Sequence, residues 1–158
     1  MRNIFLFVIL MTLLSCGASK TVRESKKEIK GEWSLDAINY SEKGTYNVTL
    51  LNDVTKECFE GSTWEFIPNN NTGKYTIYNS ECDLGPRYFI FTIQEVDSQT
   101  GLYDFLLKPT DEKGKSATNQ GFRLSLTSLT DATMQWQQTV SLEGKPFIIT
   151  MEFNKIIQ

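Results

Sequence analysis

In the stretch FIITMEFN, at residues 147–154, every second residue is large and apolar. The residues between them include Thr150, Glu152 and Asn154, so one side of an extended chain would be apolar and the other largely polar. A repeat of two residues is the signature of a β-strand that buries one face and exposes the other. The stretch therefore predicts a strand with one face turned to a hydrophobic core.

The same alternation recurs along the chain from Gly31 onward. Apolar residues share one parity at Trp33, Leu35 and Ala37; Trp64 and Phe66; Tyr75 and Ile77; Phe89, Phe91 and Ile93; Tyr103, Phe105 and Leu107; Phe122, Leu124 and Leu126; and Met134, Trp136 and Val140. A β-branched run at residues 46–51 is a further candidate strand, and residues 53–61 could hold a single helical turn. Most of the chain after Gly31 is therefore predicted to be sheet.

The breaks between these segments have the composition of turns, as in the Asn-rich run at residues 69–73 and in Glu143-Gly144. Residues 111–121 form the longest polar gap and are expected to be a loop. Strands at regular spacing with short connections are typical of antiparallel sandwiches and barrels, and a meander loses its exposed edges when it closes. The predicted fold class is all-β, an antiparallel up-and-down barrel of about eight to nine strands.

The first residues have the parts of an export signal. Arg2 precedes an almost wholly apolar run at residues 4–14, which has the length of a signal-peptide core and is too short to span a membrane. The sequence Leu-Leu-Ser-Cys-Gly at residues 13–17 resembles the bacterial lipobox. That resemblance implies diacylglycerol transfer to Cys16, cleavage before it and a palmitate-type lipid anchor. An ordinary signal peptide with a spare cysteine is the alternative.

These observations predict a lipoprotein signal peptide at residues 1–15, a lipidated Cys16 with a polar tether at residues 16–30, and a barrel domain at residues 31–158. The tether has more basic than acidic residues and could rest on anionic head groups, or it is simply a solvated linker. No acidic run follows Cys16; in some Bacteroidota lipoproteins such a run marks surface display. We therefore expect a lipid-anchored protein of the cell envelope, on the outer membrane and facing the periplasm.

With Cys16 assigned to lipid, Cys58 and Cys82 remain as a pair. Exported proteins seldom keep two free thiols, so a disulfide is predicted. A metal site or a redox pair is the alternative, but the chain has no CxxC spacing and no histidine.

Several function classes are disfavoured by composition. The chain has no histidine, so Ser-His-Asp and Cys-His arrangements are absent, and we expect a protein that is not an enzyme and needs no cofactor. The net charge of −3 without a basic stripe argues against nucleic-acid binding. Glu81 and Asp83 flank Cys82, but their spacing fits no known calcium loop, so no metal site is predicted.

The order of motifs after the tether resembles a known family. Gly31-Glu32-Trp33 resembles the Gly-x-Trp opening of lipocalins. More specifically, the chain to about residue 155 resembles lipocalin-like lipoproteins of Bacteroidota. In those proteins a Cys-Phe-x-Gly-Ser-x-Trp-x-Phe segment (residues 58–66 here), an Asn-rich turn with Gly-x-Tyr (residues 69–75 here) and a second cysteine (Cys82 here) follow. The resemblance implies a barrel closed near Trp33 and open at the other end to an apolar molecule.

The chain departs from this family at one point. Lipocalins often set an arginine of the last strand against the opening tryptophan. The last predicted strand offers only Lys155, and the arginines of the barrel domain are Arg87 and Arg123. The last predicted strand therefore has no arginine that could make the contact that closes the barrel end in lipocalins.

The inward parity of the strands predicts a set of ligand-lining candidates: Trp64, Phe66, Tyr75, Phe89, Phe91, Phe105, Phe122, Trp136, Gln138 and Phe147. Glu95 shares the inward parity and is also polar. An apolar pocket with a few polar groups is how small-molecule sites are built, although the same aromatic residues could fill a solid core. The sequence thus indicates an envelope lipoprotein that binds a small hydrophobic ligand. The alternative is a non-catalytic scaffold that binds an unknown protein partner.

Overall fold

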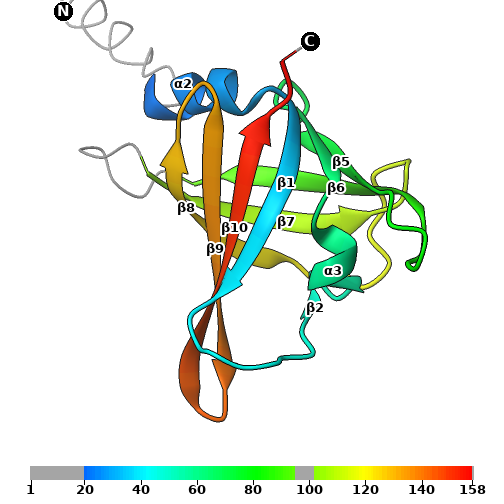
Figure 1. The fold of residues 1–158 in the computed structure, drawn as a ribbon. Coiled ribbons are helices and arrows are strands. Elements are labelled where there is room, and N and C mark those ends of the chain that lie inside the picture. The colour runs from blue at the N-terminus through cyan, green and yellow to red at the C-terminus, as the bar shows by residue number, and fades with distance from the viewer. Residues whose placement is uncertain (1–19, 95–101, 158) are drawn as a thin grey trace, which may run out of the picture.

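The computed structural model describes residues 20–94 and 102–157, and eight of its strands close into an antiparallel barrel (Figure 1). Those strands are β1 (Gly31–Tyr40), β4 (Thr63–Ile67), β5 (Thr72–Ile77), β6 (Gly85–Ile93), β7 (Asp104–Thr110), β8 (Phe122–Leu129), β9 (Thr133–Leu142) and β10 (Lys145–Lys155). Neighbours along the chain are neighbours in the sheet from β4 to β10, and β1 joins β10 to β4. The predicted up-and-down barrel is confirmed. The signal peptide, Cys16 and Glu95 lie outside the described residues.

The connection from β1 to β4 holds two very short strands and a helical turn. β2 (Thr49–Leu50) pairs with β3 (Val54–Thr55), and α3 (Lys56–Phe59) follows directly. The helical turn expected within residues 53–61 is therefore confirmed. The β-branched run at residues 46–51 forms only β2, which stands outside the barrel, because Leu51 and Asn52 turn the chain back with positive φ angles.

The structure differs from the expected tether at residues 16–30, because Lys20–Ile29 form the helix α2. Ser25 and Ile29 of this helix are buried against the barrel. The indole Nε1 of Trp33 donates to the Ile29 carbonyl at 2.9 Å, and Lys26 Nζ donates to Asn71 Oδ1 at 2.7 Å. The segment is thus part of the domain rather than a solvated linker. No helix among the described residues has the length and apolar character needed to cross a membrane.

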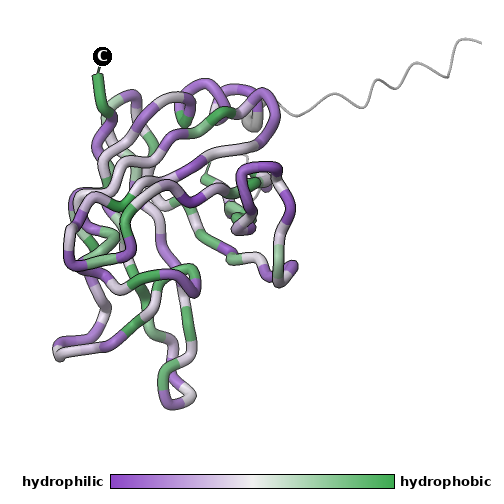
Figure 2. The backbone as a smooth tube through the Cα atoms, turned by 90° about the vertical axis from the view of Figure 1, so that its right-hand side faces the viewer, coloured by the Kyte–Doolittle hydropathy of each residue, from purple (hydrophilic) through white to green (hydrophobic). Residues whose placement is uncertain are grey.

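Alternate side chains of the strands point into the barrel, where most of them are buried. Hydrophobic and hydrophilic residues accordingly follow one another repeatedly along the chain (Figure 2). The core is unusually rich in rings. Trp136 lies at its centre, with ring centroids 4.6 Å from Phe153, 5.1 Å from Phe105 and 5.5 Å from Trp64. Aromatic pairs at such separations add to the stability that comes from burial alone.

A β-bulge changes which residues of β1 face the core. The register between β1 and β10 shifts between Leu35 and Ala37, so Ile38 rather than Ala37 is buried beyond it. The extra residue of a bulge reverses the parity of every residue that follows it. The inward position predicted for Ala37 was therefore wrong.

Gly73 of β5 leaves room for the ring of Phe89 on the neighbouring strand. A Cβ at this position would overlap that ring and lie 2.5 Å from the Glu65 carbonyl oxygen. We expect Gly73→Ala to lower the free energy of unfolding by about 1–3 kcal/mol, as overpacked cores do. Urea unfolding followed by circular dichroism would measure the loss.

Gly121 offers a matched control for that substitution. A Cβ there would meet its nearest neighbour, the Leu107 carbonyl oxygen, at an ordinary 3.6 Å. Gly121→Ala should therefore leave the unfolding midpoint nearly unchanged. Equal midpoints for the two variants would contradict the steric role of Gly73.

Candidate ligand site at the open end of the barrel

One end of the barrel is closed by a helix. At the end where β1 begins, α2 lies across the barrel (Figure 1). Lys155 Nζ stands 4.9 Å from the centroid of the Trp33 ring and donates to the Glu28 carbonyl at 2.7 Å. A lysine over an indole face makes a cation–π contact. Lys155 therefore takes the place of the arginine found in lipocalins.

Most of the predicted lining residues come together inside the barrel and are each at most 2% exposed. These are Trp64, Phe66, Tyr75, Phe89, Phe91, Phe105 and Trp136. Their rings contact one another, as in Trp64 with Tyr75 at 4.5 Å and Phe66 with Phe91 at 5.6 Å between centroids. In this structure the rings form a packed core, and the Trp136 Nε1 has no hydrogen-bond partner among the described residues.

The other three predicted lining residues lie apart from that cluster. Phe147 is buried against Tyr40 and Tyr46, with centroids 5.3 and 4.8 Å away. Gln138 is half-buried on β9 and pairs with Ile149 in the sheet. Phe122, also half-buried, lines a groove at the open end.

This groove has a volume of about 750 Å³ and lies between the β2–β3 turn and the β7–β8 loop. Its apolar wall is made by Leu51, Pro109, Ala117 and Phe122. Polar groups rim it from both sides, and one hydrogen bond of 2.9 Å joins Asn52 Nδ2 to Gln120 Oε1 across the two loops. Small-molecule sites typically have about 300–1,000 Å³ and a mostly apolar lining with a few polar groups.

Sequence reasoning found Phe122 but missed the rest of this groove. Residues 111–121 looked like a solvated loop because nearly all of them are polar or small. The signal that could have indicated the groove was the pair of apolar residues at the two ends of the loop, Pro109 and Phe122. Leu51 could not be placed beside them, because this proximity depends on how the β1–β4 connection folds back over the mouth.

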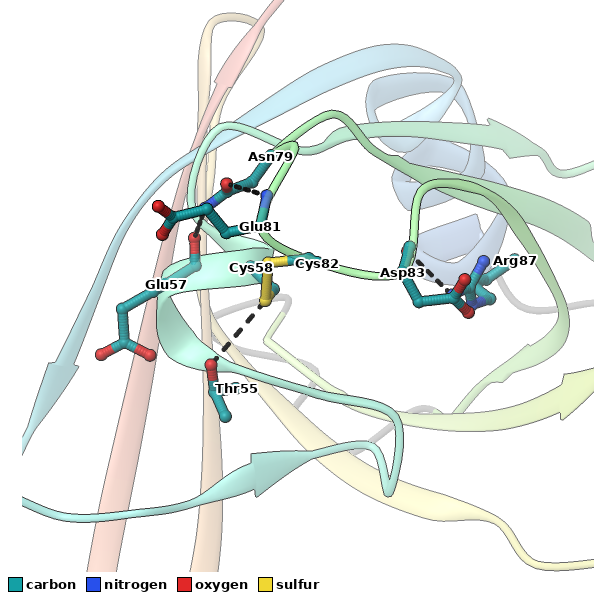
Figure 3. The surroundings of a disulfide bond; sticks show 8 residues. All are labelled: Thr55, Glu57, Cys58, Asn79, Glu81, Cys82, Asp83 and Arg87. Atoms are coloured by element: carbon teal, nitrogen blue, oxygen red, sulfur yellow. Dashed lines mark hydrogen bonds and ion pairs between the residues drawn. A yellow bond between two sulfur atoms is a disulfide. The ribbon is translucent and has the colours of Figure 1, made fainter.

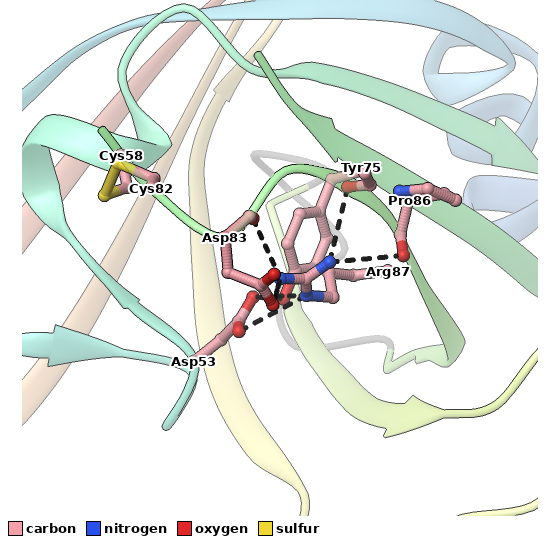
Figure 4. A network of polar contacts seen from close by, with 8 residues as sticks. Asp53, Cys58, Tyr75, Cys82, Asp83, Pro86 and Arg87 are labelled. Carbon is pink, nitrogen blue, oxygen red and sulfur yellow. Dashed lines mark hydrogen bonds and ion pairs between the residues drawn. A yellow bond between two sulfur atoms is a disulfide. The ribbon is translucent and has the colours of Figure 1, made fainter. Parts of the chain in front are cut away.

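A polar network holds the β2–β3 turn to the barrel wall (Figure 4). The Tyr75 hydroxyl donates to Asp53 Oδ2 at 2.7 Å, and Arg87 Nε lies 3.3 Å from the same oxygen. Arg87 also pairs with Asp83 at 2.6 Å. Burial raises the pKa of Tyr75 far above its usual value, as does the adjoining Asp53 carboxylate, while Arg87 acts in the opposite direction. Tyr75 is therefore neutral and serves as a donor that fixes the turn.

The predicted disulfide between Cys58 and Cys82 is confirmed, with 5.9 Å between the two Cα atoms (Figure 3). It joins α3 to the loop between β5 and β6, and Asn79 Nδ2 donates to the Glu57 carbonyl beside it at 3.1 Å. Asp83, which directly follows Cys82, is paired with Arg87. Within residues 20–94 and 102–157, no cluster of three or more acidic, cysteine or histidine side chains could hold a metal ion.

Comparison with known proteins identifies the fold. No model of a known protein family matches the chain, and no curated protein matches it in sequence. The structure is similar to the crystal structure of a lipocalin-like protein from Bacteroides uniformis, with a TM-score of 0.50 and 9% sequence identity. The likeness covers 82% of this chain and 99% of that one. At this identity it shows the fold alone, which is a lipocalin-like barrel.

Proposed function

Starting from this lipocalin-like barrel, we propose that the protein binds a small apolar molecule in the groove at its open end. We also propose that lipid on Cys16 anchors it in the bacterial cell envelope, on the outer membrane and facing the periplasm. The observation that carries the binding proposal is the groove of about 750 Å³ with apolar walls and a polar rim. The proposed role is that of a binding protein rather than an enzyme.

The packed interior restricts where a ligand can sit. Central rings such as Trp64 and Trp136 are fully buried against their neighbours, so we place the ligand at the mouth rather than between these rings. Leu51 and Phe122 approach the groove from opposite sides, one from the β1–β4 connection and one from the start of β8. A ligand that filled the groove would contact both of them, while the Asn52 and Gln120 amides could orient its polar end.

Filling the groove tests this proposal. Ala117 is exposed on the groove wall, so Ala117→Trp should occupy the space without disturbing the core. The native protein should copurify with an apolar molecule, and adding that extract back to stripped protein should raise its melting temperature. We expect Ala117→Trp to lose this rise. Mass spectrometry of solvent extracts would identify the molecule.

The matched control is Ala132→Trp, because Ala132 is an exposed alanine in the β8–β9 turn at the other end of the barrel. That variant should keep the ligand-dependent rise in melting temperature. Extracts without any bound molecule, or an equal rise in both variants, would refute binding in the groove.

The filled interior favours a second candidate, a protein-binding scaffold. The β9–β10 hairpin projects beyond the body of the barrel and exposes 41% of Leu142 (Figure 1). A partner bound there should be captured from solubilised envelopes by the native protein and lost with Leu142→Asp. A carrier would be unaffected by that substitution, which separates the two roles.

A further inference from the structure

The outer face of α2 is basic. Ser25 and Ile29 turn towards the barrel, and the exposed residues on the opposite side include Arg23 and Lys27. Residues four apart lie one above the other on a helix, so these two cations form one stripe, and Lys30, which is also exposed, directly follows the helix. Glu24 and Glu28 lie on one flank of the stripe, towards the side of the helix rather than on its outermost line.

Apolar side chains stand at the same end of the molecule. Beyond β10 the chain lies at the same end of the molecule as α2, and it shows as hydrophobic at the labelled C-terminus (Figure 2). Ile156 and Ile157 are 37% and 88% exposed, although the Ile156 amide is fixed by a hydrogen bond of 2.9 Å to the Glu32 carbonyl. Two isoleucines exposed to solvent at the same end as a basic helix are suited to a surface that is both anionic and apolar.

We propose that this end of the barrel, formed by the basic stripe of α2 together with Ile156 and Ile157, docks on an anionic phospholipid bilayer. The inference rests on the proposed lipid anchor, because Cys16 precedes Lys20 by four residues. Those residues span at most about 14 Å even when fully extended, so a lipidated Cys16 would hold α2 close to the head groups. Each basic side chain near such a surface raises the membrane binding constant roughly fivefold. Exposed aliphatic side chains can also insert into the interface between head groups and acyl chains.

This docking would fix the orientation of the molecule. The closed end carries α2 and the C-terminus, while the groove and the β9–β10 hairpin are at the other end (Figure 1). The open mouth would therefore face away from the lipid surface.

Fluorescent labels at the two ends test the orientation. The lipidated native chain is made with Ile157→Cys or Leu142→Cys, two exposed aliphatic positions at opposite ends, and labelled with an environment-sensitive dye. Each is reconstituted in vesicles of phosphatidylcholine with or without 30% phosphatidylglycerol. The label at 157 should shift to shorter wavelength on anionic vesicles, and 0.5 M salt should reverse the shift. The label at 142 should not shift.

Charge reversal supplies the matched control. Arg23→Glu with Lys27→Glu should abolish the shift of the label at 157, whereas Lys113→Glu with Lys145→Glu, the same charge change at the open end, should preserve it. Equal shifts at both labels, or a shift that survives the α2 reversal, would overturn the docking proposal. The intact mass is measured first: an unlipidated Cys16 would refute the anchor, whereas a lipidated protein whose label at 157 stays in water would refute only the docking.

Discussion

Replacing Trp136 with alanine is expected to lower the free energy of unfolding by about 3–5 kcal/mol, the usual cost of removing a large buried aromatic ring. The indole is fully buried and touches rings from three other strands, those of Trp64, Phe105 and Phe153. These neighbours belong to a closed sheet and can move little into the space that the substitution leaves. Urea unfolding followed by far-ultraviolet circular dichroism would measure the loss.

Two further measurements separate packing from other roles of this residue. Trp136→Phe keeps a ring in place and removes no hydrogen bond to described residues, so it should cost much less than the alanine variant. Indole or benzene should partly restore the melting temperature of Trp136→Ala, because a dry apolar cavity can bind such molecules. A loss below about 1 kcal/mol, together with weaker uptake of the natural ligand, would show that the ring lines a pocket instead.

Removing the disulfide should have the second-largest effect. The bond joins residues separated by 24 positions, and restriction of the unfolded chain predicts about 3.5 kcal/mol for a loop of this size. Cys58→Ser with Cys82→Ser should lower the free energy of unfolding by that amount. Hydrogen exchange should quicken most in α3 and the β5–β6 loop, since the bond holds these two segments together.

Reduction of the native protein is the control for that experiment. A thiol reductant should bring the wild-type unfolding midpoint close to that of the double serine variant and should leave the variant itself unchanged. An unfolding midpoint that is equal in oxidised and reduced wild-type protein would disprove a stabilising role for the bond.

The barrel could be predicted from the sequence because its information is local. In a strand with one buried face, apolar and polar residues alternate along a short stretch of sequence. The example is β10, on which Phe147, Ile149, Met151 and Phe153 are all buried. The closed sheet followed from such patterns and their regular spacing, whereas the Cys58–Cys82 bond followed from the count of cysteines in a chain expected to be exported. The bulge after Leu35 did not, because it depends on how β1 meets β10.

The helix α2 and the groove were missed for a related reason. A ten-residue helix with few apolar residues is unstable alone and forms because Ser25 and Ile29 pack on the barrel. The groove likewise joins Leu51 to Phe122, which are distant in sequence and adjacent only after folding. Comparison with a family motif residue by residue also missed the contact of Lys155 with Trp33, because the family resemblance implied an arginine at this place.

The pairing of the first barrel strand with the last has a consequence for folding. β1 finds one of its two partners in β10, where Trp33 pairs with Lys155 from the far side of the barrel sequence. Until β10 docks, the incomplete sheet has two open edges at β1 and β9. Because chain entropy must be lost before such distant strands can meet, we expect closure of the barrel to be a late and slow step of folding.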